Sequence, residues 1–356
     1  MKKNLKSVGM GMFLSVALLT GCPGPETQDP DPIVSERCGE TTADYLAFDV
    51  TNHAAQDERL KAIDEMVAMY GVAESDPTKA AAQAAAVLAK YQDPTTNLQA
   101  KVKGREDKHF TGDAAAVGPA LDATTLAAIE DLKNAKTKLQ VSLAKQRFQK
   151  AGMYRFLYLS VMEELYEPSY KHYDEAYGYL GTGPSNAEAG RRGLSKLATG
   201  RDGNNQTTLA AELFALMKEG SCTIETALKA KNADSMAAHT DDQNYARFVQ
   251  SVDDKLMIVF AYSVGHELFD IDLNKEKPDP AYIKLVEGEG FFQTMEPYMK
   301  QAPAGSAKAV LAAKLRAAFN SAMEKAKNND TTWITDIKAT ELLGEIEAAY
   351  GIDVKA

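Results

Sequence analysis

The sequence predicts an all-α fold of stacked antiparallel helices, with little or no sheet. Long segments repeat apolar residues at helical spacing, and short connections join them. Runs of alternating β-branched residues are few, so strands should be minor. Hydrophobic residues make up 45% of the 356-residue chain, which is enough for a large core in one helical bundle or two packed bundles.

Residues 1–21 have the pattern of a lipoprotein signal peptide. A lysine-bearing start precedes the apolar run Val8–Leu19, and Leu19-Thr20-Gly21-Cys22 matches a box for cleavage and lipidation. The apolar run is too short to span a bilayer permanently. We therefore expect acylated Cys22 to anchor the mature chain to a membrane. The alternative is an ordinary secretory signal followed by a chance cysteine.

Residues 22–40 predict a tether between this anchor and a helical domain over residues 41–356. The tether is rich in proline and acids and has no apolar periodicity, so it cannot build a core. Pro23 stands where an aspartate would retain a lipoprotein in the inner membrane. In a Gram-negative host we therefore expect the outer membrane, with the domain facing the periplasm or the cell surface.

Two cysteines remain after lipidation, Cys38 and Cys222. Disulfides persist in exported compartments, so we expect a bond between the start of the domain and a loop near Gly220. The alternative is two separate buried thiols.

The charge balance limits the classes of partner. The chain carries 40 basic and 50 acidic residues, a net charge of −10, and no basic patch interleaved with aromatic residues. Nucleic acid is therefore not an expected partner, whereas cations are. The chain also lacks a nucleophile elbow, a phosphate-binding loop and a dinucleotide fingerprint.

Helical patterns follow one another along the domain. The expected helices are Ala54–Tyr70, Thr78–Tyr91, Thr124–Glu167, Asn186–Leu197, Thr207–Lys218, Thr223–Ala238, Asp242–Asp272, Pro280–Met299, Ser306–Ala326 and Thr335–Tyr350. Gly71 is expected to cap the first helix, and Asp76-Pro77 is a start signal for the second. The polar stretch Leu98–Gly118 is expected as an irregular insertion that holds His109. Gly200–Asn205 is expected as a loop.

Within the long helical pattern a break is expected near Gly152, and the chain concentrates its unusual residues around this point. Phe148–Gly183 holds seven of the fifteen tyrosines. On the expected helix, four polar residues share one face through their i, i+3, i+4 and i+7 spacing. They are Ser160, Glu163, Glu164 and Glu167. Pro168 marks a helix break, and His172 and Glu175 follow at i, i+3 spacing, so both should point the same way.

This constellation has two interpretations. One is a cation site formed by His172 and Glu175 with an acid from Glu163, Glu164 or Glu167. An imidazole with carboxylates suits iron or another divalent cation, and phenolate oxygens would further suit ferric iron. The other interpretation is structural, with tyrosine rings in the core and acids lining solvent.

A second histidine helix is expected over Asp253–Leu273. His266-Glu267-Leu268-Phe269-Asp270 nearly matches the zinc-protease pattern H-E-x-x-H, with Asp270 in place of the second histidine. His266 and Asp270 could ligate a metal with Glu267 as a base, which predicts a metal-dependent peptidase as one alternative. The other interpretations are a non-catalytic ligand pair and a thin solvent-facing stripe with Ser263.

The segment His172–Tyr179, HYDEAYGY, resembles the H-(W/Y)-D-E-A-(F/Y)-G-Y motif of an uncharacterised family of bacterial lipoproteins. That family is associated with imelysin-type, iron-regulated surface proteins. Phe148–Met153 is similar to the family's preceding helix, and Ala261–Asp270 resembles its second histidine helix. The resemblance implies an envelope setting and a link to iron, but no reaction. Imelysins carry G-x-H-x-x-E, whereas Gly265-His266-Glu267 lacks the spacer.

Together these observations predict an envelope-anchored lipoprotein with a non-catalytic binding role. Its ligand is expected to be a metal or metal complex, with iron first, in an uptake system that includes a partner protein. The alternative is a structural lipoprotein whose tyrosine-rich surface docks a partner protein.

Overall fold

A computed structural model describes residues 37–38, 44–183 and 185–355. The predicted signal peptide, the predicted lipidation residue Cys22 and most of the predicted tether lie outside the described residues. Within the described residues, the only pairing of extended backbone is an isolated bridge between Ser169 and Ser235. The prediction of an all-α fold without a sheet is therefore confirmed.

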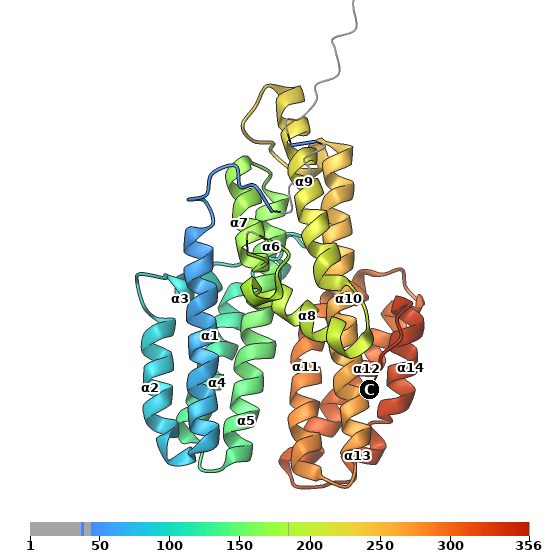
Figure 1. The fold of residues 1–356 in the computed structure, drawn as a ribbon. Coiled ribbons are helices and arrows are strands. Elements are labelled where there is room, and N and C mark those ends of the chain that lie inside the picture. Colours follow the sequence, from blue (N-terminus) through green and yellow to red (C-terminus); the bar gives the residue numbers. More distant parts are fainter. Residues whose placement is uncertain (1–36, 39–43, 184, 356) are drawn as a thin grey trace, which may run out of the picture. The chain divides into compact units, whose positions relative to one another are not determined.

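Figure 1 labels the α-helices in chain order. Their bounds are α1 Ala54–Ser75, α2 Ala80–Tyr91, α3 Leu98–Lys103, α4 Gly118–Asn134, α5 Lys138–Gln146, α6 Arg155–Tyr166, α7 Tyr170–Leu180, α8 Gly193–Asn205, α9 Leu209–Lys231, α10 Gln243–Leu273, α11 Pro278–Gln301, α12 Ala307–Lys327, α13 Trp333–Asp336 and α14 Ala339–Tyr350. A π-helix, η3, spans Arg147–Tyr154 between α5 and α6.

The helices pack in two groups around one continuous cluster of buried apolar side chains. In the first group α1 packs on α2 and α5, and α4 packs on α2 and α5. In the second group α10 packs on α9, α11 and α14, and α11 packs on α12 (Figure 1). η3 contacts both α4 and α11, and α6 contacts both α7 and α10, so these two elements join the groups.

Helix α1 continues past the predicted end at Gly71. Ala73 is fully buried, and the backbone at Gly71 has open space around it, so burial carries the helix one turn further to Ser75. The predicted C-cap at Gly71 is therefore wrong. The start signal Asp76-Pro77 is confirmed, because the Asp76 side chain accepts a hydrogen bond from the Thr78 amide.

The helical pattern over Thr124–Glu167 breaks at residues 135–137 rather than at Gly152. Thr137 starts the new helix with a reciprocal capping box to Gln140, a local signal that outweighs the glycine. At Gly152 the chain stays helical but widens into η3. A Cβ at Gly152 would lie 3.0 Å from the Thr125 hydroxyl, so this glycine serves packing against α4.

Other predicted boundaries are also wrong. α8 begins at Gly193 rather than at Asn186 and contains residues 200–205, in place of the expected loop. α9 runs unbroken through Gly220 and ends at Lys231 rather than at Ala238. A Cβ at Gly220 would overlap the Phe248 ring and the Tyr173 hydroxyl. The glycine therefore allows close packing of α9, and the helices expected on either side of it are one.

Two segments mix helix with irregular backbone. The expected irregular insertion contains α3 and then an irregular stretch over residues 104–117 that carries His109. The last expected helix is divided into α13 and α14, where Lys338 adopts a left-handed conformation with φ of 52°.

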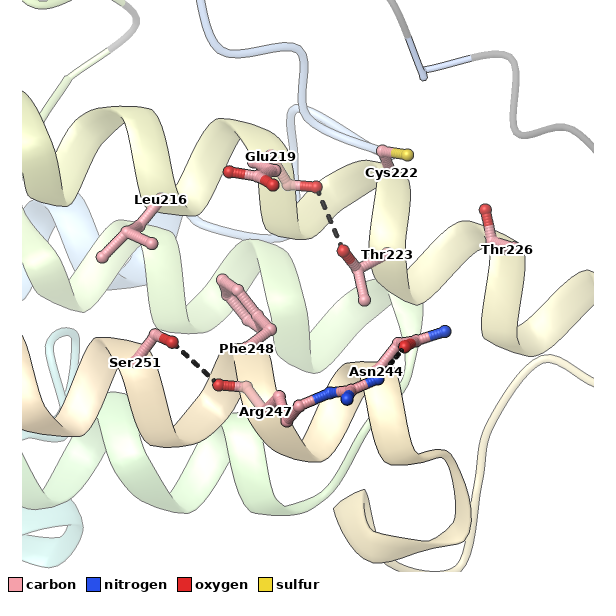
Figure 2. A pocket seen from close by; sticks show the side chains of 9 residues that line it. All are labelled: Leu216, Glu219, Cys222, Thr223, Thr226, Asn244, Arg247, Phe248 and Ser251. Atoms are coloured by element: carbon pink, nitrogen blue, oxygen red, sulfur yellow. Dashed lines mark hydrogen bonds between the residues drawn. The ribbon is translucent and has the colours of Figure 1, made fainter.

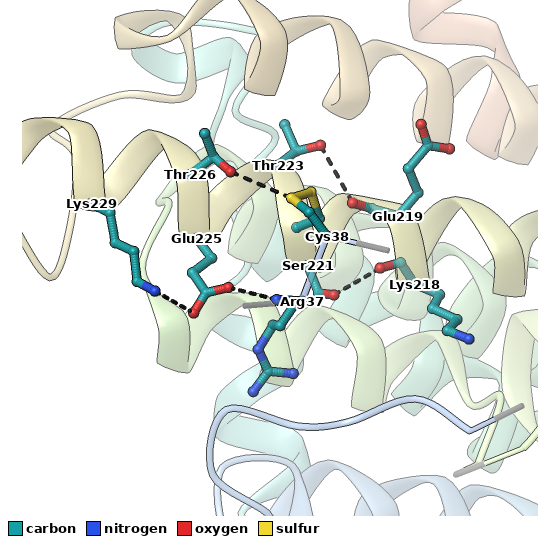
Figure 3. The surroundings of a disulfide bond; sticks show 10 residues. Arg37, Cys38, Lys218, Glu219, Ser221, Thr223, Glu225, Thr226 and Lys229 are labelled. Atoms are coloured by element: carbon teal, nitrogen blue, oxygen red, sulfur yellow. Dashed lines mark hydrogen bonds and ion pairs between the residues drawn. A yellow bond between two sulfur atoms is a disulfide. The ribbon is translucent and has the colours of Figure 1, made fainter. Parts of the chain in front are cut away.

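A disulfide joins Cys38 to Cys222, as predicted. Cys222 lies within α9 and not in a loop. Figure 3 shows the backbone amide of Arg37 donating to Glu225 one turn further along α9, at 3.2 Å. The Arg37 guanidinium lies 3.9 Å above the Phe48 ring. The start of the domain is thus held on α9 by a covalent bond and by Arg37.

None of the helices in the described ranges is long and apolar enough to cross a membrane.

The disulfide closes a loop over a sequence separation of 184 residues. In Cys22→Ala protein that is unfolded but unreduced, we expect no titratable thiol. Because the bond restricts the unfolded chain, reduction should lower the free energy of unfolding by roughly 2–5 kcal/mol. Thiol titration and thermal unfolding with and without reductant measure both effects. Two reactive thiols before reduction would contradict the bond.

Candidate cation site at the hairpin of two helices

Helices α6 and α7 form a tight hairpin. Pro168 ends α6, and Ser169 starts α7 by accepting a hydrogen bond from the His172 amide at 3.1 Å. The hairpin turns the last turn of α6 against the first turns of α7 (Figure 1). Side chains separated by a helix break in the sequence therefore meet in space.

Three of the predicted ligands converge at this hairpin. Ligand atoms of Glu164, His172 and Glu175 all lie within 4.8 Å of one another. Their side chains are 8%, 31% and 15% exposed, so the group lies at the edge of the core with access to solvent. Within the described part of the chain, this is the only group of three histidine, cysteine or acidic residues that converges in this way.

His172 is oriented as metal-binding histidines usually are. Its Nδ1 lies 2.6 Å from the backbone carbonyl of Glu167, so Nδ1 carries the proton and donates it there. No described residue donates a hydrogen bond to its other ring nitrogen, Nε2. A backbone carbonyl that fixes the tautomer in this way is the common outer contact of a ligating histidine.

The carboxylate of Glu164 is shared between the cluster and a buried arginine. The Arg105 Nη1 lies 3.3 Å from Glu164 Oε1. Burial raises the pKa of Glu164 to about 7, and the charges of Glu175 and Glu163 act in the same direction, against Arg105 and His172. A cation close to this cluster would relieve the repulsion between the carboxylates.

The other two predicted acids of α6 are held by the segment Arg105–Phe110, which we call the strap. Glu163 lies 3.2 Å from the Arg105 guanidinium and also accepts from the Glu106 amide at 3.2 Å. Glu167 pairs with Lys108 at 2.9 Å. The structure therefore places these two acids beside the cluster, paired with the strap.

A half-buried histidine of the strap, His109, binds it to α10. His109 lies between two carboxylates, with Nδ1 3.1 Å from Asp107 and Nε2 3.2 Å from Asp253. The remaining oxygens of these acids accept from Tyr298 at 2.8 Å and Tyr158 at 2.6 Å. Burial acts to lower the pKa of His109, but the two carboxylates outweigh it and raise the pKa to about 9.

Other residues of the HYDEAYGY segment are structural. Asp174 is fully buried and accepts from the Tyr45 hydroxyl, the backbone amides of residues 48 and 49, and the Asn52 side chain. It holds the segment before α1 against α7. Gly178 provides close approach, since a Cβ there would lie 2.7 Å from the His53 Cβ.

The tyrosines of this segment do not join the cluster. Tyr173 and Tyr177 donate to backbone carbonyls, and the Tyr179 hydroxyl accepts from Arg59 and Arg105. Burial raises the pKa of Tyr173 and Tyr179, which disfavours phenolate. Tyr173, Tyr177 and Tyr179 are also buried, whereas Tyr166 and Tyr170, earlier in the tyrosine-rich stretch, are partly exposed.

The second predicted group, His266 and Asp270 on α10, lies in a separate ion network. His266 Nε2 is 3.7 Å from Asp270 and 3.2 Å from the Asn204 amide. Lys284 of α11 lies 2.8 Å from Asp270 and 3.0 Å from Glu267. Burial and Arg201 lower the pKa of His266. The pair His266 and Asp270 therefore lies among the charged residues of α8, α10 and α11, and not with the hairpin group of His172.

The solvent-stripe interpretation of this helix face fails for two of its four residues, while the side chains of His266 and Asp270 are 16% and 18% exposed. Glu267 is only 1% exposed and Ser263 is fully buried, because α11 covers the face. Two polar residues of the stripe have partners inside the protein: Arg201 lies 3.5 Å from Glu267, and the Ser263 hydroxyl donates to the Val259 carbonyl. The buried Nδ1 of His266 has no hydrogen-bond partner among the described residues. With Lys284 on its carboxylate, Glu267 has no access to a water that it could activate.

A hollow of about 450 Å³ lies between α9 and α10 beside Cys222 (Figure 2). Several of its polar side chains bond within their own helices, and Thr226 contacts Cys38 Sγ at 3.7 Å. Thr223 donates to the Glu219 carbonyl at 3.4 Å and Ser251 to the Arg247 carbonyl at 2.9 Å, as Figure 2 shows. Arg247 itself pairs with Asn244. The hollow therefore offers no convergent set of donors or acceptors.

No protein-family model, curated protein or solved structure matches the chain. The resemblance to the lipoprotein family thus stays a prediction that depends on His172–Tyr179.

Sequence reasoning missed the strap. Arg105, Lys108 and the acids around His109 fall in a stretch that has no periodic pattern. One signal was available: three basic residues occur within five positions of a polar insertion, and the mostly apolar segment Arg155–Tyr166 carries two adjacent glutamates. Charge complementarity could have suggested the pairing.

The charge on His109 should make stability depend on pH. The folded pKa of about 9 exceeds the unfolded value of 6.5, so the stabilisation is fully present below pH 6.5 and is lost as the pH rises through 9. The variant His109→Gln should lack this loss between pH 6.5 and 9. Denaturant unfolding of both proteins across this range measures the difference. Parallel profiles would contradict a protonated His109.

Proposed function

We propose that this chain is an envelope-anchored lipoprotein that binds a divalent transition-metal ion without catalysing a reaction. The observation that carries the proposal is the convergence of Glu164, His172 and Glu175, with the tautomer of His172 fixed by a backbone carbonyl. Iron is the first candidate because of the family resemblance of His172–Tyr179. An uptake partner in the envelope and the outer-membrane location belong to the same proposal.

The donor set favours one class of cation. One imidazole nitrogen and two carboxylates suit Mn²⁺, Fe²⁺ or Zn²⁺. Ca²⁺ prefers six to eight oxygen ligands, which this group does not supply. With three protein ligands, water or a small ligand of the metal would complete the coordination, so a metal complex fits as well as a bare ion.

The peptidase alternative has less support. It needs Glu267 as a base next to a metal on His266 and Asp270. Lys284 pairs with the carboxylates of Glu267 and Asp270, and its positive charge would oppose a metal ion there.

The proposal predicts saturable cation binding that depends on the hairpin. Protein purified without a metal-affinity tag should bind Mn²⁺, Fe²⁺ or Zn²⁺ with one site in calorimetry. His172→Ala with Glu175→Gln should weaken binding at least tenfold, because two of three ligands are lost. Helical content should stay nearly unchanged, since both side chains lie at the edge of the core.

The matched control is His266→Ala with Asp270→Asn, which removes the same ligand types from α10. This control should bind as the wild type does. Equal loss in both double variants, or no saturable binding to the wild type for any of the three ions, would refute the hairpin site.

The anchor predicts a second, independent outcome. Cys22→Ala should prevent acylation and release the protein from membranes, because no acyl chain then holds it. Fractionation after a high-salt wash measures this, with labelled fatty acid as a direct reporter of lipidation. If the variant still pellets with membranes, the lipoprotein assignment does not hold.

A further inference from the structure

The strap brings a positive charge to the same carboxylate that the candidate cation site uses. Arg105 is 3% exposed and its guanidinium contacts both Glu163 and Glu164. Its Nη2 donates to the Tyr179 hydroxyl at 2.9 Å. A buried arginine with this many fixed partners has one position, unlike a mobile surface lysine.

We infer that Arg105 is a built-in competitor for the cation, and that the strap keeps the site in a restrained, low-affinity state by holding this guanidinium on Glu164. The inference deepens the proposed function and rests on it. A bound ion and Arg105 both require the negative charge of Glu164, and like charges at this separation repel. Each therefore weakens the hold of the other on the carboxylate.

Contacts of the strap hold Arg105 beside Glu164. The strap is fastened beyond Arg105 by His109 between Asp107 and Asp253. Its backbone is also fixed, because the Gly118 amide donates to the Arg105 carbonyl at 2.9 Å and the Asp107 amide to the Ala115 carbonyl at 2.8 Å. The charge of Arg105 thus stays beside the site whether or not an ion is bound.

Arg105 already contacts a second acid, so it keeps a partner without moving. When an ion takes Glu164, Glu163 at 3.2 Å and the Tyr179 hydroxyl still satisfy the guanidinium. Binding is then an exchange of partners within a closed structure, without an opening of the strap. Glu163 is the residue that makes the exchange feasible, although it does not ligate the ion.

The test compares variants that remove the competitor with and without a change in net charge. Arg105→Gln removes the competing charge, and Arg105→Lys retains it. The double variant Arg105→Gln with Glu163→Gln removes one charge of each sign, so the net charge of the protein is unchanged. Zn²⁺ and Mn²⁺ are titrated into each by calorimetry, with circular dichroism as a check of folding.

Arg105→Gln and the double variant should both bind at least tenfold more tightly than the wild type, and Arg105→Lys should bind close to the wild type. If Arg105→Gln fails to fold, the double variant provides the test. It leaves one unpaired carboxylate, Glu164, whereas Arg105→Gln alone leaves two. Wild-type binding with equal or weaker binding by the folded double variant would overturn the competitor while the proposed function stands.

Binding by the double variant alone also distinguishes the Arg105 competitor from the proposed cation binding of the wild type. If the wild type binds no ion but the double variant does, the competitor is supported and the proposed function of the wild type is refuted. If neither binds, both are refuted.

Discussion

The pairing of Arg105 with two glutamates of α6 is the interaction on which the hairpin depends. Glu164 is nearly buried, and a buried carboxylate without a cation or a proton is strongly destabilising. Because Arg105 also shares Glu163, one guanidinium allows α6 to place two acids against the core. Without it, α7 could not bring His172 and Glu175 up to Glu164 at so low a cost.

The fixed position of Arg105 depends in turn on contacts far from the hairpin. His109 stays protonated at neutral pH because two carboxylates flank it, and Tyr158 and Tyr298 complete the hydrogen bonding of those acids. α6, α10 and α11 each contribute to this network. An irregular segment is thus held more firmly than its lack of secondary structure suggests, since its polar groups are bonded to three helices.

The sequence alone predicts the features of the structure that depend on the periodic spacing of residues. The fold class followed from apolar spacing, and the shared face of His172 and Glu175 followed from their i, i+3 spacing. It was insufficient for what depends on contacts between distant residues. Arg105 and Glu164 are 59 positions apart, with no local pattern to join them. Glycine was the least reliable signal, because Gly220 serves packing against Phe248 rather than a turn.

Two buried glutamates show why similar residues need not make similar sites. Burial raises the pKa of both Glu164 and Glu267, and each has a histidine nearby. Around Glu267, Lys284 supplies the positive charge, and the Nε2 of the neighbouring histidine lies 3.2 Å from the Asn204 amide. Around Glu164, the Nδ1 of His172 lies 2.6 Å from the backbone carbonyl of Glu167. The convergence of ligand atoms separates the two: those of Glu164, His172 and Glu175 lie within 4.8 Å of one another, whereas Lys284 lies on the carboxylates of Glu267 and Asp270.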